Sequence, residues 1–310
     1  MIDPSDFLEV DAPVLLSGSL AALACGLLGN FLVLQRRALV VDAVGHAVLP
    51  GIVVGFLVTG TTSEAAMFAG ALAASVLAVA MIEFLQRAVR IEPGAAIAVV
   101  LTSLFALGVV VLERSDARSI HLDVQHALMG SLETVVWLGA EDWSAIFDSE
   151  RLLRLPSMLV RLLVVTVVVV TVLFALAKEF TMVVFDPAHA RSLGIPVRFL
   201  SLLFLLLCAV TAVASFQAVG AILTVAMFVC PAATARMFTD RLRVQIALSA
   251  LVALLAGASG YALAAWAPLL CGFERGFGAA GGIALAAGIL QTLAVVFAPR
   301  YGILVRRERV

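Results

Sequence analysis

Charged residues are scarce in this chain. Only 13% of its 310 residues are Asp, Glu, Lys or Arg, and 63% are hydrophobic, whereas a soluble domain has about 25% charged residues. The net charge of −1 leaves no basic surface of the kind that binds nucleic acid. Together with a mean hydropathy of +1.13, this composition excludes both an ordinary soluble globule and a disordered chain.

Motifs of enzymes and of small metal-stabilised domains are also absent from the sequence. It contains no nucleotide-binding GxxxxGK[S/T], no HExxH and no GxSxG, so nothing indicates catalysis by this chain. The cysteines are far apart and form no CxxC pair, which argues against a zinc finger or a disulfide framework. We expect them to be small buried hydrophobic residues: Cys25, Cys208, Cys230 and Cys271.

Long apolar runs dominate the sequence instead. Each is near the length of about 20 residues with which a helix crosses a bilayer, and none alternates as the strands of a β-barrel do. We therefore predict an all-α polytopic membrane protein, a bundle of about nine transmembrane helices forming a single transmembrane domain over 1–310. The expected spans are about 14–34, 38–59, 64–86, 93–112, 158–177, 198–215, 217–235, 244–267 and 278–298.

The distribution of Lys and Arg orients these spans. With an outer N-terminus, most of the 20 Lys and Arg residues fall in cytoplasmic segments, which satisfies the positive-inside rule. The first run follows an acidic segment rather than a basic leader, so we expect it to be retained as a span. We predict a cell (inner) membrane protein with its C-terminus in the cytoplasm. The stretch 120–138 is expected to be an interfacial or half-inserted helix on the outer side.

An acid and an imidazole stand four residues apart in the second predicted span. On a helix, Asp42 and His46 would be separated by about 6 Å of rise and would share one face. An Asp inside lipid costs about 2.5–3.5 kcal/mol, and a bound Mn, Fe or Zn ion would offset that cost. A two-fold dimer would supply two Asp and two His ligands. A proton relay and a hydrogen bond that joins helices are the alternatives.

Pro50 and Gly51 follow this pair directly. Proline removes the N–H that would bond to the carbonyl of the residue four positions earlier, here His46. We therefore expect a kink or break of the helix at the site, as in many transporters. A kink that serves only packing is the alternative.

The loop after the fifth predicted span contains the signals of a short helix. Asp186 is a candidate N-cap with Pro187 at the first helical position, and Gly194 is a candidate C-cap. These residues predict a cytoplasmic helix over about 187–193, too short to be stable unless it docks on another surface. A connecting turn packed on its own bundle is the alternative.

Other motifs have weaker signals. His121, Asp123 and His126 are possible metal contacts at the outer mouth, although solvated loop side chains are the more ordinary interpretation. The segment from Val219 to Arg236, with Pro231, fits close helix packing and an anchored cytoplasmic end.

Three segments in this order resemble the permeases of manganese/zinc/iron ABC importers, known as the ABC-3 type. They are Asp42–Gly51, Phe185–Gly194 and Val219–Arg236, and the likeness extends from about residue 14 to 300. The resemblance implies the helical architecture of metal and vitamin–siderophore importers, and a metal site made by Asp42 and His46. The motif often has Ser before this His, whereas the chain has Gly45.

The resemblance also implies partners. The 187–193 helix would couple to a separate cytoplasmic ABC ATPase that binds the ATP, through Asp186, Pro187, Ala190, Arg191 and Gly194. An extracytoplasmic metal-binding protein would deliver the metal, and a second permease protomer, identical or a sister chain, would complete a dimer. The chain itself would hold no covalent cofactor and would carry Mn, Zn or Fe as its substrate. A permease for a metal chelate such as a siderophore, and an ion-coupled secondary metal transporter, are the alternative functions.

Overall fold

The computed structural model describes residues 7–61, 63–114, 130–138, 154–270 and 277–304. Within these ranges the regular secondary structure is entirely helical, and the prediction of an all-α membrane protein is confirmed. The helices are η1 (Phe7–Asp11), α2 (Ala12–Leu34), α3 (Leu39–Thr59), α4 (Glu64–Phe84), η2 (Leu85–Val89), α5 (Pro93–Arg114), η4 (Leu132–Thr134), α8 (Ser157–Ala175), α9 (Ala177–Phe185), α10 (Pro187–Ser192), α11 (Val197–Val219), α12 (Ala221–Phe238), α13 (Leu242–Ala265), α14 (Ala267–Leu270) and α15 (Ala279–Phe297).

The number of membrane-spanning helices is close to the prediction of about nine. In the described ranges, 8 helical segments are long and apolar enough to cross a membrane, and Leu223–Phe238 is a shorter apolar helix. That shorter helix lies where the span 217–235 is expected. It begins later than predicted because α11 continues to Val219 and the chain turns at Gly220, whose φ of +90° favours glycine.

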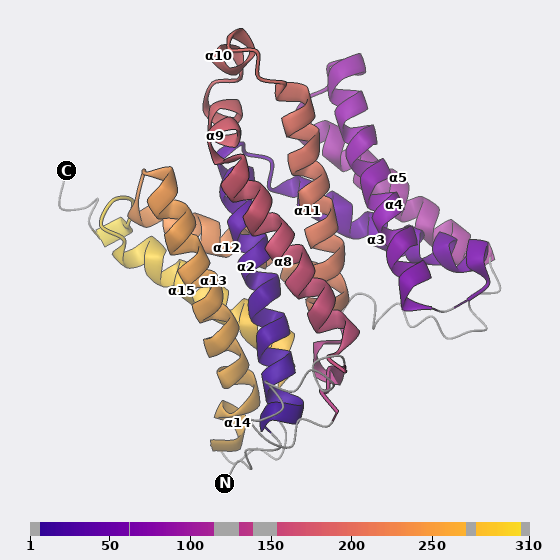
Figure 1. Ribbon diagram of the computed structural model, residues 1–310, viewed down its shortest axis with the longest axis vertical. Coiled ribbons are helices and arrows are strands. Elements are labelled where there is room, and N and C mark those ends of the chain that lie inside the picture. Colours follow the sequence, from indigo (N-terminus) through magenta and orange to yellow (C-terminus); the bar gives the residue numbers. More distant parts are fainter. Residues whose placement is uncertain (1–6, 62, 115–129, 139–153, 271–276, 305–310) are drawn as a thin grey trace.

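The helices are arranged side by side in three groups (Figure 1). α3, α4 and α5 lie together on one side, α12, α13 and α15 on the other, and α2, α8 and α11 between them, with α10 and α14 at opposite ends of the molecule. Small residues let the backbones touch, as is usual in membrane bundles. A Cβ atom at Gly29 of α2, for example, would overlap the carbonyl oxygen of Phe228 in α12.

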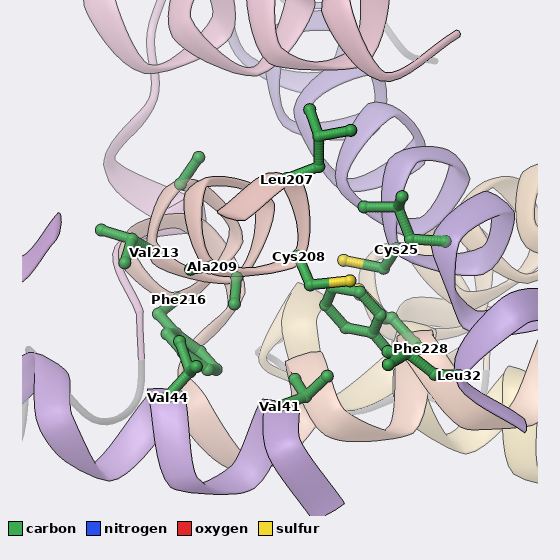
Figure 2. Packing of buried hydrophobic residues seen from close by; sticks show 14 of the residues in the cluster. Cys25, Leu32, Val41, Val44, Leu207, Cys208, Ala209, Val213, Phe216 and Phe228 are labelled. Atoms are coloured by element: carbon green, nitrogen blue, oxygen red, sulfur yellow. The ribbon is translucent and has the colours of Figure 1, made fainter. Parts of the chain in front are cut away.

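The core between α2, α3, α11 and α12 is apolar and includes two of the cysteines (Figure 2). Cys25 and Cys208 are completely buried among Leu, Val and Phe side chains, and Cys25 Sγ lies 3.3 Å from Ser215 Oγ. Cys230 is partly buried and Cys271 lies outside the described residues. Cys25 and Cys208 therefore act as small buried packing residues, as predicted, whereas Cys230 is not fully buried.

The group of α3, α4 and α5 depends on close contact between glycines and Pro50. A Cβ at Gly51 would lie 2.5 Å from the carbonyl oxygen of Gly70 in α4, and a Cβ at Gly108 of α5 would lie 2.9 Å from Pro50 Cδ. Both neighbours therefore press on α3 at the position of its proline. This contact determines how closely α5 approaches α3.

The predicted break of the helix at Pro50 and Gly51 is wrong, because the helix is not interrupted there, whereas a kink at this position stays a prediction. α3 runs from Leu39 to Thr59 as one helix with Pro50 inside it. Proline still deprives the His46 carbonyl of its usual donor, and α4 and α5 contact α3 closely there, through Gly70 at Gly51 and Gly108 at Pro50. Neighbouring helices commonly allow a proline in this way inside a membrane bundle.

Candidate metal site

Asp42 and His46 lie on one face of α3, as their spacing predicts. The distance from His46 Nε2 to Asp42 Oδ1 is 3.7 Å, so one cation between them could contact both side chains. Asp42 belongs to the first turn of α3, where the positive end of the helix dipole favours a carboxylate. The helix therefore directs an acid and an imidazole toward the same point.

Between Val40 and Gly51 of α3, only the side chains of Asp42 and His46 are left partly uncovered by this chain. Asp42 retains 41% of its side-chain exposure and His46 39%, whereas every other residue from Val40 to Gly51 is buried. Polar groups normally avoid an uncovered position in a membrane helix unless they face a partner or a cavity. The pair thus lies on a surface that faces either a partner or a cavity.

The ring of Phe105, on α5, packs against His46. The centroids of the two rings are 5.4 Å apart and their planes are inclined by 86°, an edge-to-face contact. Nothing in the sequence around Phe105 distinguishes it from the other apolar residues of its span. The sequence analysis therefore missed this neighbour of the candidate ligand.

Gly45 has no side chain because another aromatic ring fills the space beside it. A Cβ atom at Gly45 would lie 2.7 Å from Cζ of Phe216 in α11, and Figure 2 shows the Phe216 ring next to Val44 of α3. The chain therefore has a phenyl ring beside α3 at the position where the family motif often provides a serine hydroxyl. Phe216 positions the α3 backbone one residue before His46.

The described part of one chain provides too few ligands for a complete metal site. Among the described residues, no group of three or more His, Cys, Asp or Glu side chains could hold a metal ion. A tight transition-metal site needs about four donors. Two copies of the Asp42–His46 pair would supply them, two oxygen and two nitrogen donors of the type that Mn, Fe and Zn accept.

The expected short helix is present as α10, Pro187–Ser192. The Asp186 carboxylate caps it by accepting hydrogen bonds from the N–H groups of Ala188 (3.1 Å) and His189 (2.9 Å). At the other end Gly194 has a φ of +78°, and the N–H of Ile195 donates to the Ala190 carbonyl at 3.0 Å, which is a Schellman ending.

One side of α10 packs on the rest of the chain, and the other side is exposed. Ala190 is fully buried, whereas Asp186, Pro187, Arg191 and Gly194 are exposed. Beside them, Phe185 and Leu193 are 59% and 56% exposed. An exposed apolar surface of this kind usually binds another protein.

An aromatic cluster connects α10 to the interior. Phe180 of α9 packs against Phe31 of α2 and Phe204 of α11, with ring centroids 6.1 and 5.9 Å away, and Phe31 and Phe204 are 5.8 Å apart. α9 directly precedes α10, and Phe31 lies one turn from the end of α2, which leads into α3. The cluster therefore links α9, the helix before α10, to α2, the helix before α3.

The candidate outer contacts His121, Asp123 and His126 lie outside the described residues, and so does most of the stretch 120–138. The described part of that stretch, 130–138, contains η4, Leu132–Thr134. It packs on the end of α11, because the Ser131 N–H donates to the Gln217 carbonyl at 3.2 Å.

Comparison with known proteins shows the family. The family model described as "ABC 3 transport family" matches residues 8–142 and 152–272. The chain belongs to the ABC 3 transport family. The resemblance that the Asp42–Gly51, Phe185–Gly194 and Val219–Arg236 segments indicate is thereby confirmed.

Relatives of this ABC 3 family chain are membrane proteins of transport systems. It is 37% identical over 302 residues, 97% of each chain, to the "Manganese transport system membrane protein MntD" of Bacillus subtilis (strain 168). It is 32% identical over 294 residues, 95% of this chain and 75% of the relative, to the "Zinc transport system membrane protein TroD" of Treponema pallidum (strain Nichols).

A solved structure has the same fold. "PsaBC from Streptococcus pneumoniae in complex with Fab" superimposes with a TM-score of 0.70 and 25% identity, over 96% of this chain and 94% of that chain. This likeness confirms the predicted architecture of an ABC metal permease. It extends through the helices that carry the Asp42–His46 pair and α10.

Proposed function

We propose that this ABC 3 family chain is the membrane-spanning subunit of an importer that moves a divalent transition metal, Mn, Zn or Fe, into the cytoplasm. The chain is not itself an enzyme in this proposal, and a separate ABC subunit binds and hydrolyses the ATP. The names of the relatives, which specify manganese or zinc transport systems, support the substrate class. The observation that carries the proposal is the uncovered Asp42–His46 pair of α3.

In this proposal Asp42 and His46 are the metal ligands, and a second permease protomer covers them. The pair is about two-fifths exposed in one chain, within an otherwise buried stretch of α3. A related surface from a second copy or a sister chain would add two more donors and remove the pair from lipid. A two-fold arrangement of this type completes a site with one set of residues from each subunit.

The position of the pair along α3 defines a direction of transfer. With the N-terminus outside, as the Lys and Arg distribution predicts, α3 begins at the cytoplasmic side. His46 is then the ligand nearer the outer face and Asp42 the ligand nearer the cytoplasm, within the first turn of the helix. Metal delivered by an extracytoplasmic binding protein would reach His46 first and leave past Asp42.

Coupling to ATP hydrolysis is assigned to α10. The exposed Asp186, Pro187, Arg191 and Gly194, with buried Ala190 as the anchor, would contact the cytoplasmic ABC ATPase. The aromatic cluster of Phe31, Phe180 and Phe204 would carry the displacement of α10 to α2. The ligand pair would then open inward when α2 and α3 move.

Transport assays with substituted ligands test the proposal. The complete importer, reconstituted in vesicles, would be assayed for uptake of radiolabelled Mn²⁺ and Zn²⁺ in competition. We expect Asp42→Ala and His46→Ala to abolish uptake of the transported metal, because each removes a donor from every copy of the site. ATP hydrolysis by the assembled complex would remain measurable, since neither residue belongs to α10.

A matched acidic control separates loss of a ligand from loss of charge. Glu92 is exposed in the segment between η2 and α5, so Glu92→Ala should transport normally. Uptake at the wild-type rate by both ligand variants would refute the site. Uptake of a metal chelate alone, or of metal without the ATPase subunit, would instead support one of the two alternative functions.

A further inference from the structure

Aromatic residues of two other helices pack against α3 at His46 and at the residue before it. Phe216 of α11 fills the space beside Gly45 and so positions the backbone. Phe105 of α5 contacts the imidazole itself, edge to face, with a centroid distance of 5.4 Å. The first contact acts on the main chain, whereas the second acts on the group that would bind the metal.

The packing of α5 explains why Phe105 reaches His46. Gly108 lets α5 approach the ring of Pro50, since a Cβ there would lie 2.9 Å from Pro50 Cδ. Phe105 lies three residues before Gly108, and His46 lies four residues before Pro50, each about one helical turn. The contact at Pro50 therefore places Phe105 beside His46, one turn away along both helices.

Phe105 also lies on the uncovered surface beside the candidate ligand His46. Phe105 is exposed, and the side chains of Asp42 and His46 are partly exposed. Because the two rings touch and both are partly uncovered, they line the same surface. An apolar ring at that position keeps water away from one side of the imidazole and restricts its rotation.

We propose that Phe105 is a positioning residue for the metal substrate: its ring fixes the orientation of the His46 imidazole and limits the number of further ligands that reach the ion. The inference rests on the proposed function, because it takes His46 as a ligand. Phe105 itself donates nothing to the metal. Its ring restricts the His46 imidazole before the metal binds, so that less conformational entropy is lost on binding.

Metal binding by the full permease assembly tests this role. Mn²⁺ binding would be measured by calorimetry, and the ligand geometry by the visible absorption spectrum of bound Co²⁺. We expect Phe105→Leu to weaken Mn²⁺ binding by about 2- to 10-fold, the range that corresponds to one aromatic pair. We expect the Co²⁺ bands to weaken as well, because extra water raises the coordination number. Phe105→Tyr, which keeps the ring, should restore both properties.

Control variants distinguish a specific role of Phe105 from a general effect of losing an aromatic ring. Phe174→Leu makes the same change at an 87% exposed position of α8 and should alter neither measurement. Wild-type affinity and spectrum for Phe105→Leu, with binding lost in Asp42→Ala, would overturn the role of Phe105 and leave the proposed function intact. Weaker binding with an unchanged spectrum and no recovery in Phe105→Tyr would indicate a merely structural residue and would also overturn it.

Two further results complete the design. Unchanged Mn²⁺ binding in Asp42→Ala would show that the proposed site itself is wrong, whatever Phe105→Leu does. If Phe105→Leu does not assemble, Phe105→Ile provides the same loss of the ring with a different shape, and the same comparison with Phe105→Tyr applies.

Discussion

At the scale of single residues, the space left by neighbouring helices limits which side chains fit beside the candidate ligands. Gly45 precedes His46, and the Phe216 ring occupies the volume that a side chain at position 45 would need. This contact explains why the chain can lack the serine that the family motif often has. The backbone before the ligand is positioned by a ring from α11 instead of by a hydroxyl.

The space beside Gly45 leads to a prediction on stability and transport. Gly45→Ala and Gly45→Ser should each destabilise the protein by about 1–3 kcal/mol, because overpacking forces a shift of Phe216 or of α3. Thermal unfolding of the purified protein would measure the loss, and metal uptake should fall with it. Phe216→Leu should restore stability in the Gly45→Ser background, since it vacates part of the same volume.

A second glycine provides the control for this experiment. Among the described residues, a Cβ atom added at Gly288 of α15 would meet no heavy atom of a neighbouring helix within 4 Å. Gly288→Ala should therefore be neutral or stabilising by up to about 1 kcal/mol. Equal destabilisation by the two substitutions would show that the effect arises from helix flexibility and not from the contact with Phe216.

At the scale of elements, α10 is a helix of 6 residues that depends on its ends. So short a helix is unstable in isolation, and here an Asp186 cap, a proline at the first position and a Schellman ending hold it. The buried Ala190 seats it on the rest of the chain. Its ends are thus held by hydrogen bonds although most of its surface is exposed, as the proposed contact with an ATPase would require.

The N-cap of α10 leads to a second prediction. Asp186→Ala removes the acceptor of two N–H groups and should cost about 1 kcal/mol of local stability. In the proposed function this frays α10, so ATP-driven uptake should fall while equilibrium metal binding stays unchanged. Asp186→Asn, which retains a side-chain acceptor, should behave nearly as the wild type. A parallel loss of metal binding would contradict a role confined to coupling.

At the scale of the whole molecule, Arg161 joins three helices near the end of the bundle opposite α10. Its guanidinium donates to Gln217 of α11 and to Glu64 of α4, the latter at 3.1 Å. Its Cζ also lies 4.8 Å from the centre of the Phe68 ring. α8 is thereby connected to the group that carries the ligand pair and to the helix that carries Phe216.

This connection leads to a third prediction, on stability. Arg161→Met should lower the free energy of unfolding by about 1–2 kcal/mol, because it leaves the Gln217 oxygen without its donor. Glu64→Gln should change it by less than about 0.5 kcal/mol, because the Glu64 side chain is 69% exposed and a surface ion pair contributes little. Thermal unfolding of both variants would check this, and equal losses would mean that the ion pair, not the Gln217 contact, joins the helices.

Local relations within the chain could be predicted from the sequence, because helix geometry relates residues three or four positions apart. The approximate positions of the spans, the common face of Asp42 and His46, and the caps of α10 all follow from such short spacings. Residues that act through distant neighbours could not be predicted in this way. Phe105 and Phe216 appear in the sequence as ordinary members of apolar runs, and the predicted break at Pro50 ignored the helices packed around it.

The sequence by itself determined that this chain crosses the membrane as helices and carries an acid and an imidazole one turn apart, since hydropathy and the period of the helix operate within a single segment. Only the tertiary structure decided that α3 stays continuous through Pro50, that the ligand face is left uncovered, and that Phe105 lies against His46. Those features depend on contacts such as Gly108 with Pro50 and Gly51 with Gly70. Which face of each helix is buried depends on the packing of all the helices together, and not on the sequence of one helix.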